Sequence, residues 1–75
     1  MYSIIYFLDN NSGLTYFVSD FSILFNKVFV KFSSNPDDAC YITSKHAERV
    51  SEFVPSLYDP IILTSEDWLI IKKSL

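Results

Sequence analysis

The sequence predicts a small α+β domain in which one main amphipathic helix packs on an antiparallel sheet of three to five strands. Two segments with alternating apolar side chains flank a turn that holds the single glycine, Gly13, and this pattern predicts an N-terminal β-hairpin. Residues 45–54 carry apolar side chains at helical spacing. A length of 75 residues corresponds to one domain, so we expect residues 1–75 to fold as a single unit.

The first strand is predicted over residues 2–8, where both alternating faces carry aromatic or aliphatic side chains. Ile4 belongs to one face and Ile5 to the other, and both faces are apolar enough to be covered. The run Asp9-Asn10-Asn11-Ser12-Gly13 supplies turn residues, and residues 14–18 repeat the alternation as the return strand. Because a two-stranded ribbon is only marginally stable, we expect further strands to join it.

A short turn and a third strand are predicted next. Ser19 and Asp20 are suited to cap one turn over residues 21–25, and residues 27–32 alternate as a strand. Pro36 ends this strand, because proline has no amide hydrogen for a sheet ladder. We expect Asn35 to cap a single turn over residues 37–39, and residues 41–42 to be briefly extended.

The clearest helix is predicted over residues 45–54. Thr43 or Ser44 caps its start, its apolar positions follow the helical period, and Pro55 ends it. One amphipathic helix against a sheet is the minimal two-layer core.

The last third of the chain leaves two alternatives after a predicted strand at residues 60–63. Acids before Trp68 and lysines at the end favour a helix, because these charges complement the helix dipole. The four adjacent apolar residues 68–71 favour a strand through their bulk and β-branching. We expect the strand, as the second half of a hairpin, because such a run suits a strand that is covered on both faces.

Charge and hydropathy restrict the classes of partner. The formal net charge is -3, and residues 32–71 hold seven acids against two bases. A surface of this sign repels phosphate backbones, so we expect no direct nucleic-acid binding. The longest apolar runs are only a few residues, far below the roughly 18 to 20 that a membrane-spanning helix needs. We therefore expect no membrane partner and a cytoplasmic location.

The chain contains no motif for catalysis, a cofactor or a metal, and we expect a protein that is not an enzyme and holds none of these groups. Cys40 and His46 are the single cysteine and the single histidine. Nothing in their spacing brings a thiolate to an imidazole, and a small buried Cys with a His on the helix surface explains both. One histidine and one cysteine also cannot build a zinc site unaided.

The candidate partner-binding residues are acids and aromatics, a mixture that is typical of protein interfaces. Paired carboxylates occur in two polar, turn-like stretches, and two helix acids are expected to point outward. Trp68, beside two acids, is the first candidate for a binding hot spot, although core placement is more common for any one aromatic residue in so small a chain. The full set is Asp37, Asp38, Tyr41, Glu48, Glu52, Tyr58, Glu66, Asp67 and Trp68.

The order of the elements resembles a pattern in small accessory proteins of tailed bacteriophages. The features that carry the resemblance lie within residues 2–54 and are the hairpin, Asp20-Phe21, a strand ending at Phe32, and Ala39-x-x-Ile42-x-Ser44-x-x-Ala47 ahead of the helix. The resemblance implies a host-takeover or anti-defence protein that binds a host enzyme, a transcription or replication factor or a defence complex, such as a CRISPR effector, and blocks it. The residues after Pro60 have no counterpart in that pattern.

Together these features predict a small acidic inhibitor or modulator that docks on a basic surface of a host protein or complex. Opposite charge would speed the encounter, and buried aromatics would set the residence time. In one alternative the carboxylates imitate nucleic-acid phosphates, which a net charge of only -3 disfavours. In the other, apolar strand faces form a homo-oligomer, for example a homodimer, as in a structural or assembly subunit.

Overall fold

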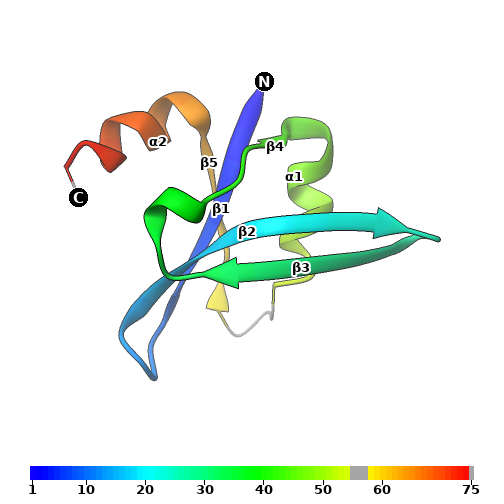
Figure 1. Cartoon of the computed structure of the whole chain (residues 1–75), viewed down its shortest axis with the longest axis horizontal. Coiled ribbons are helices and arrows are strands. Elements are labelled where there is room, and N and C mark those ends of the chain that lie inside the picture. The colour runs from blue at the N-terminus through cyan, green and yellow to red at the C-terminus, as the bar shows by residue number, and fades with distance from the viewer. Residues whose placement is uncertain (55–57, 75) are drawn as a thin grey trace.

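The computed structural model describes residues 1–54 and 58–74, and these residues form an α+β fold with a five-stranded antiparallel sheet (Figure 1). The predicted fold class and its N-terminal hairpin are confirmed. The elements in chain order are β1 (Tyr2–Asp9), β2 (Leu14–Leu24), β3 (Lys27–Ser33), the 3-10 helix η1 (Pro36–Asp38), β4 (Ile42–Thr43), α1 (Ser44–Ser51), β5 (Ile61–Thr64) and α2 (Ser65–Lys72).

β1 is the central strand of the sheet. Its residues 6–9 pair with β2, its residues 3–6 pair with β5, and Tyr2 and Ser3 pair with β4. Ser3 has partners in both β4 and β5, and Tyr6 has partners in both β2 and β5, so β5 occupies one edge of β1 while β2 and β4 share the other. All three partners run antiparallel to β1.

Both faces of β1 are covered, as the alternation of its side chains predicts. The α1 face of the sheet carries a core that includes Ile5, Phe7 and Val50. The α2 face carries a smaller core in which Trp68 packs with Ile4 and the β2 residue Phe17. Because adjacent strand residues point to opposite faces, a helix on each side is needed to bury both isoleucines.

A β-bulge lets the long strand β2 keep its apolar residues on the α1 face. The register between β2 and β3 shifts by one residue directly after Val18. Before the shift Tyr16 and Val18 face α1, and after it Phe21 and Ile23 do. In the sequence, the apolar positions of β2 that face α1 are even-numbered up to Val18 and odd-numbered from Phe21 onward. The extra residue at the bulge reverses the alternation of the strand, so both sets of apolar side chains lie on the same face.

Beyond the bulge, β2 and β3 continue as a two-stranded arm that projects from the rest of the sheet (Figure 1). The predicted turn over residues 21–25 is therefore wrong, because the alternation resumes after the bulge and β2 runs to Leu24. The strand predicted over residues 27–32 is confirmed as β3. The tip consists of Phe25 and Asn26, whose φ angles of 51° and 63° suit a two-residue hairpin turn of type I′.

The middle of the chain follows the prediction in outline, although Thr43 at the start of α1 makes no side-chain capping hydrogen bond. The side chain of Asn35 accepts a hydrogen bond from the Asp37 amide at 3.0 Å and caps η1. α1 begins after Thr43 and buries Ala47 and Val50, but it ends at Ser51, before the predicted end at residue 54. The expected helix stop at residue 55 lies outside the described residues.

The segment after β5 is the helix α2, so the prediction of a hairpin strand there is wrong. The Thr64 hydroxyl accepts a hydrogen bond from the Asp67 amide at 3.3 Å, which caps the helix start. Glu66 and Asp67 in the first turn and Lys72 in the last turn complement the helix dipole. These end effects, with Trp68 buried to 2% exposure, outweigh the β-branching of the residues that follow it.

Replacing Trp68 with Ala should lower the free energy of unfolding by about 3–5 kcal/mol, because the ring fills the α2-face core. Ile70→Ala is the matched control on the same helix, since Ile70 is 67% exposed and its truncation should change stability by less than about 0.5 kcal/mol. Urea titrations of both variants measure the difference. Equal losses for the two variants would contradict the placement of α2.

Candidate partner-binding surfaces

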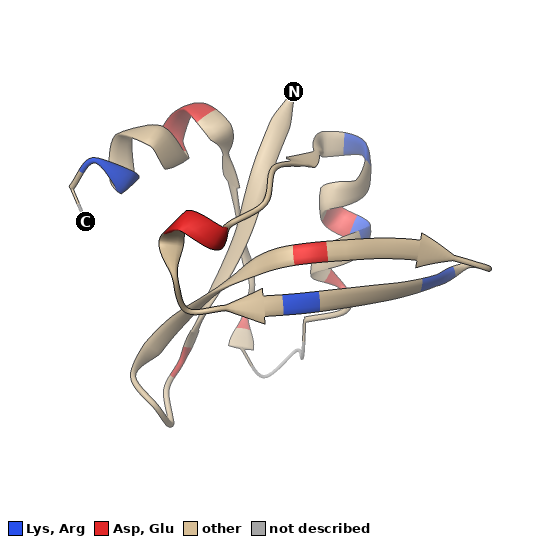
Figure 2. Ribbon diagram, viewed as in Figure 1, with Lys and Arg blue, Asp and Glu red and all other residues tan. Residues whose placement is uncertain are grey.

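The predicted acidic residues do not form one surface. Glu48 lies on α1 and Glu52 at its C-cap, both on the α1 side of the sheet. The η1 residue Pro36 and the α2 residue Trp68 line the same cavity, so η1 and α2 share the other side. The acids on that side are Asp37, Asp38, Glu66 and Asp67. Figure 2 shows the same division, with acidic segments on separate elements.

The three aromatic candidates have different environments. Trp68 is 2% exposed, and its ring centroid lies 5.2 Å from that of Phe17, so it belongs to the core on the α2 face. Tyr58 is half-buried against Phe7, with ring centroids 4.9 Å apart. Tyr41 is 47% exposed. A ring beside acids in sequence can point inward when the acids occupy the outer side of the same helix.

An apolar groove of about 290 Å³ lies between the sheet, η1 and α2, and we call it the α2 groove. Tyr6, Phe17 and Leu63 contribute to it from the strands. Pro36 contributes from η1, and Trp68 and Ile71 contribute from α2. These residues are far apart in the sequence, which is why the sequence alone did not reveal the groove. Rings and branched aliphatic side chains around a hollow suit the burial of an apolar group.

Carboxylates occur on the two elements that border the α2 groove, η1 and α2. Asp37 follows the groove residue Pro36, and Asp67 lies one turn before the groove residue Ile71, on the same side of α2. Asp38 accepts a hydrogen bond from the Ser33 hydroxyl at 2.7 Å. Asp37 and Asp67 therefore stand next to groove residues in sequence and on their elements, and Lys72 directly follows the groove residue Ile71.

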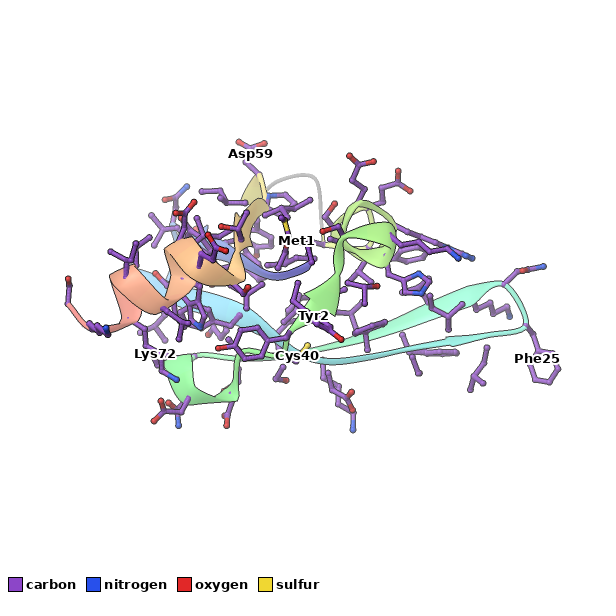
Figure 3. All side chains as sticks on the ribbon, turned by 90° about the horizontal axis from the view of Figure 1, so that it is seen from above. Met1, Tyr2, Phe25, Cys40, Asp59 and Lys72 are labelled. Carbon is purple, nitrogen blue, oxygen red and sulfur yellow. The ribbon has the colours of Figure 1, made fainter. Side chains whose placement is uncertain are left out.

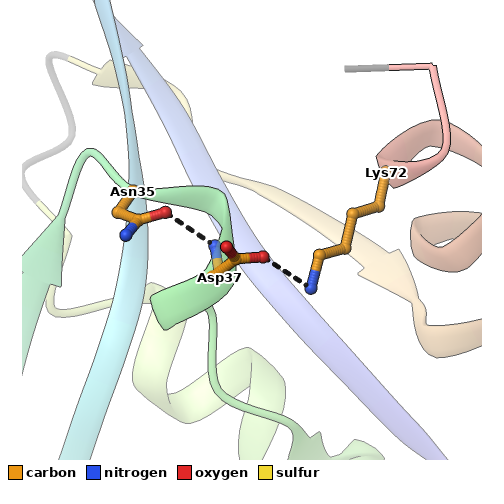
Figure 4. A network of polar contacts seen from close by, with 3 residues as sticks. All are labelled: Asn35, Asp37 and Lys72. Atoms are coloured by element: carbon orange, nitrogen blue, oxygen red, sulfur yellow. Dashed lines mark hydrogen bonds and ion pairs between the residues drawn. The ribbon is translucent and has the colours of Figure 1, made fainter.

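That lysine connects α2 to η1. Lys72 Nζ lies 3.1 Å from Asp37 Oδ1, and the Asp37 amide is held in turn by Asn35 (Figure 4). The Asp37 side chain is 77% exposed, so water screens the pair and it stabilises the fold by at most about 1 kcal/mol. Its structural effect is to tie together two elements that border the groove.

Phe25 at the tip of the β2–β3 arm is 96% exposed, the highest fraction among the exposed large apolar residues of the described chain. Figure 3 shows it at the far end of the arm. Its left-handed backbone costs a residue with a Cβ roughly 1–2 kcal/mol. Within one chain this cost is not offset by burial of the Phe25 ring, which is exposed. A backbone outlier of this kind suggests that the tip has a function.

The outer face of the arm is apolar and basic. Leu24 and Phe29 are each 55% exposed there, and the register places Lys27 opposite Leu24 on the same face. Arg49 of α1 donates a hydrogen bond to the backbone carbonyl oxygen of Asn26 at 3.4 Å, which brings a guanidinium to the tip. The sequence analysis missed this surface because it assigned Phe25 to a capped turn. The available signal was Asn26 between two alternating segments.

A second hollow, of about 240 Å³, lies on the α1 face beside Phe7, Tyr16, Phe32 and Tyr58. Its lining also includes Asp9, whose carboxylate accepts hydrogen bonds from the Asn11 amide and the Ser12 hydroxyl, each at 3.0 Å. The carboxylate oxygens of Asp9 are thus engaged by the β1–β2 turn. This hollow is a gap between packed aromatic rings.

The environment of Cys40 opposes nucleophilic chemistry. Burial raises the pKa of the Cys40 thiol, and the Asp20 carboxylate raises this pKa further. The thiol is therefore protonated at neutral pH, whereas nucleophilic cysteines have a lowered pKa.

The centroid of the His46 ring lies 6.5 Å from that of the Phe21 ring. Within residues 1–54 and 58–74, no group of three or more His, Cys, Asp or Glu side chains is placed to hold a metal ion.

Comparison with known proteins identifies no relative. No protein-family model, no curated protein and no solved structure matches the chain. In the part of the chain that the structure describes, neither helix has the length and apolar character to cross a bilayer. The α2 groove and the Phe25 tip are therefore the two features on which an interpretation of function rests.

Replacing Phe25 with Asn should raise the free energy of unfolding by about 1 kcal/mol, because Asn tolerates left-handed backbone and the ring makes no contact that is lost. Phe29→Asn is the matched control, since Phe29 lies on the same arm in extended backbone, where Asn is unfavourable. The free energy of unfolding of the Phe29→Asn variant should therefore fall. Chemical denaturation in dilute solution compares the two, and a loss of stability in both variants would contradict the assignment of strain to the tip.

Proposed function

We propose that the protein is a small protein-binding inhibitor or modulator, and that the α2 groove is its contact surface. The observation that carries this proposal is an apolar, partly aromatic groove whose bordering elements η1 and α2 carry carboxylates. Such a groove accepts a large apolar side chain, and the carboxylates favour Lys or Arg beside that side chain on the partner. The partner chemistry is therefore a basic surface that carries an apolar anchor.

The two parts of the groove have different roles in this proposal. Burial of one Leu- or Phe-sized anchor contributes about 1.5–3 kcal/mol and sets how long the complex lasts. Asp38 and Asp67 speed the encounter by attraction at a distance, an effect that falls off over about 8 Å at physiological salt, whereas Lys72 offsets the charge of Asp37. Inhibition requires no catalytic step by this protein. Once bound, it covers the partner's surface and blocks any activity that depends on that surface.

The class of partner comes from the resemblance to accessory proteins of tailed bacteriophages. On that basis the partner is a host protein or a defence complex, such as a CRISPR effector, in the cytoplasm of an infected cell. This identity stays a prediction.

The nucleic-acid mimic is the weaker alternative. A mimic needs carboxylates in one array at phosphate-like spacing, whereas Glu48 and Glu52 lie on the opposite side of the sheet from Asp37 and Asp67. Lys72 also offsets the charge of Asp37. The homo-oligomer remains a second candidate, because Phe25 is exposed at the end of a projecting arm.

Affinity capture with paired variants of α2 tests the proposal. Ile71→Glu places a carboxylate inside the groove, and Ile70→Glu places the same charge on the neighbouring residue, which does not line the groove. We expect the unmodified protein and Ile70→Glu to retain one stoichiometric basic partner, with less retained as salt increases, and Ile71→Glu to lose at least about tenfold in affinity. Equal retention by the two variants would refute the groove as the contact surface.

A further inference from the structure

We infer that the Phe25 tip of one copy of this protein inserts into the α2 groove of a second copy. The inference rests on the proposed role of the groove as a binding surface, and it names an occupant that any other partner has to displace. Self-association of this kind would keep the groove covered when the protein is concentrated and would release it on dilution.

The tip has the chemistry that the proposal requires of an anchor. Phe25 is 96% exposed and Leu24 beside it is 55% exposed, so the arm ends in an apolar knob. Two intramolecular contacts limit its motion: β2 pairs with β3 as far as Leu24 and Lys27, and Arg49 holds the Asn26 carbonyl oxygen. A preorganised anchor loses little entropy on binding.

The groove is large enough for this ring. An engineered protein cavity of about 150 Å³ accepts benzene. The α2 groove measures about 290 Å³, and the half-buried Tyr6 is the aromatic residue of its lining that keeps the most exposed surface, because Phe17 and Trp68 are 4% and 2% exposed. An offset or edge-on contact with the Tyr6 ring would stabilise the complex beyond simple burial, and this favours Phe over an aliphatic anchor.

Charge around the two surfaces is complementary. Lys27 and Arg49 stand near the tip, and Figure 2 shows the basic segments of β3 along the arm. On the groove side, Asp67 lies one turn before the groove residue Ile71 and Asp38 lies on η1 with the groove residue Pro36, whereas Asp37 is paired with Lys72. The attraction between them would orient two copies tip to groove, and salt would weaken it.

The geometry makes the contact intermolecular. The tip lies at one end of the longest axis of the molecule, which measures 38 Å, and α2 lies at the other end (Figure 1). The tip therefore cannot reach the groove of its own chain. Two copies side by side in opposite directions would make the contact twice and close as a pair, whereas copies in one direction would form an open chain.

Pairing of the free β3 edges is a poorer route to self-association. An antiparallel pair centred on Phe29 would place Lys27 of one copy opposite Lys31 of the other. Like charges directly opposite each other destabilise a sheet, and lysines on an edge strand are a known protection against such pairing. Insertion of the tip avoids this repulsion.

The test measures mass in solution for single variants and for their mixture. We expect the unmodified protein to associate reversibly between micromolar and millimolar concentration in analytical ultracentrifugation. Phe25→Asn should weaken association at least about tenfold by removing the anchor. Ile71→Glu should do the same by blocking the groove, and Leu14→Glu is a second groove variant at a residue that is 48% exposed.

Mixing identifies the contact. A Phe25→Asn chain still has an open groove and an Ile71→Glu chain still has its tip, so the mixture should form a 1:1 complex although each variant alone is monomeric. Phe53→Asn removes a ring that is 49% exposed next to α1, and it should leave association unchanged. A monomeric unmodified protein over the whole range, unchanged association of Phe25→Asn, or a mixture without the complex would each overturn the inference.

The two proposals fail separately. If the unmodified protein stays monomeric while Ile71→Glu loses its captured partner, the second copy is refuted as an occupant and the proposed function stands. If the protein associates through tip and groove but captures no other protein, the groove serves self-association and the inhibitor proposal is refuted.

Discussion

The rest of the structure depends on the burial of both faces of the central strand β1. Ile4 and Ile5 are adjacent, point to opposite faces, and are both 0% exposed. A single helix covers only one face of a sheet, so burial of both faces of β1 requires one helix on each face. The constraint explains why the bulky segment after β5 folds as α2: in that form it delivers Trp68 to the face that α1 does not cover.

The α2 groove exists because α2 is shorter than the strand that it covers. β1 and α2 each have eight residues, but at about 3.3 Å per strand residue and 1.5 Å per helix residue they span about 26 Å and 12 Å. α2 is therefore too short to cover the whole strand. The uncovered part of the α2 face, bounded by η1, forms the groove, and the Asp37–Lys72 pair ties its borders together. A small domain with this arrangement leaves apolar surface for a partner or a second copy.

Sequence patterns predicted the elements that obey one simple period. The alternation in residues 2–8 and 27–32 and the helical spacing in α1 each depend on local contacts, which a single sequence displays. The bulge after Val18 changed the phase of the alternation, so the arm and its Phe25 tip were missed. α2 was mistaken for a strand because a short apolar run suits both states, and burial of Trp68 against Phe17 adds to the capping and dipole effects that favour the helix. The groove was not predictable, since its lining comes from six separate elements and linkers.

The most direct test of this account compares Ile4→Ala with Ile5→Ala by denaturant unfolding in dilute solution. If both faces of β1 are buried, each substitution lowers the free energy of unfolding by about 2–5 kcal/mol. Ile→Val at the same positions should cost about 0.5–1.5 kcal/mol each, which preserves the comparison if an alanine variant does not fold. A loss below about 1 kcal/mol for one alanine variant beside a large loss for the other would show that one face is open to water, and would contradict the account.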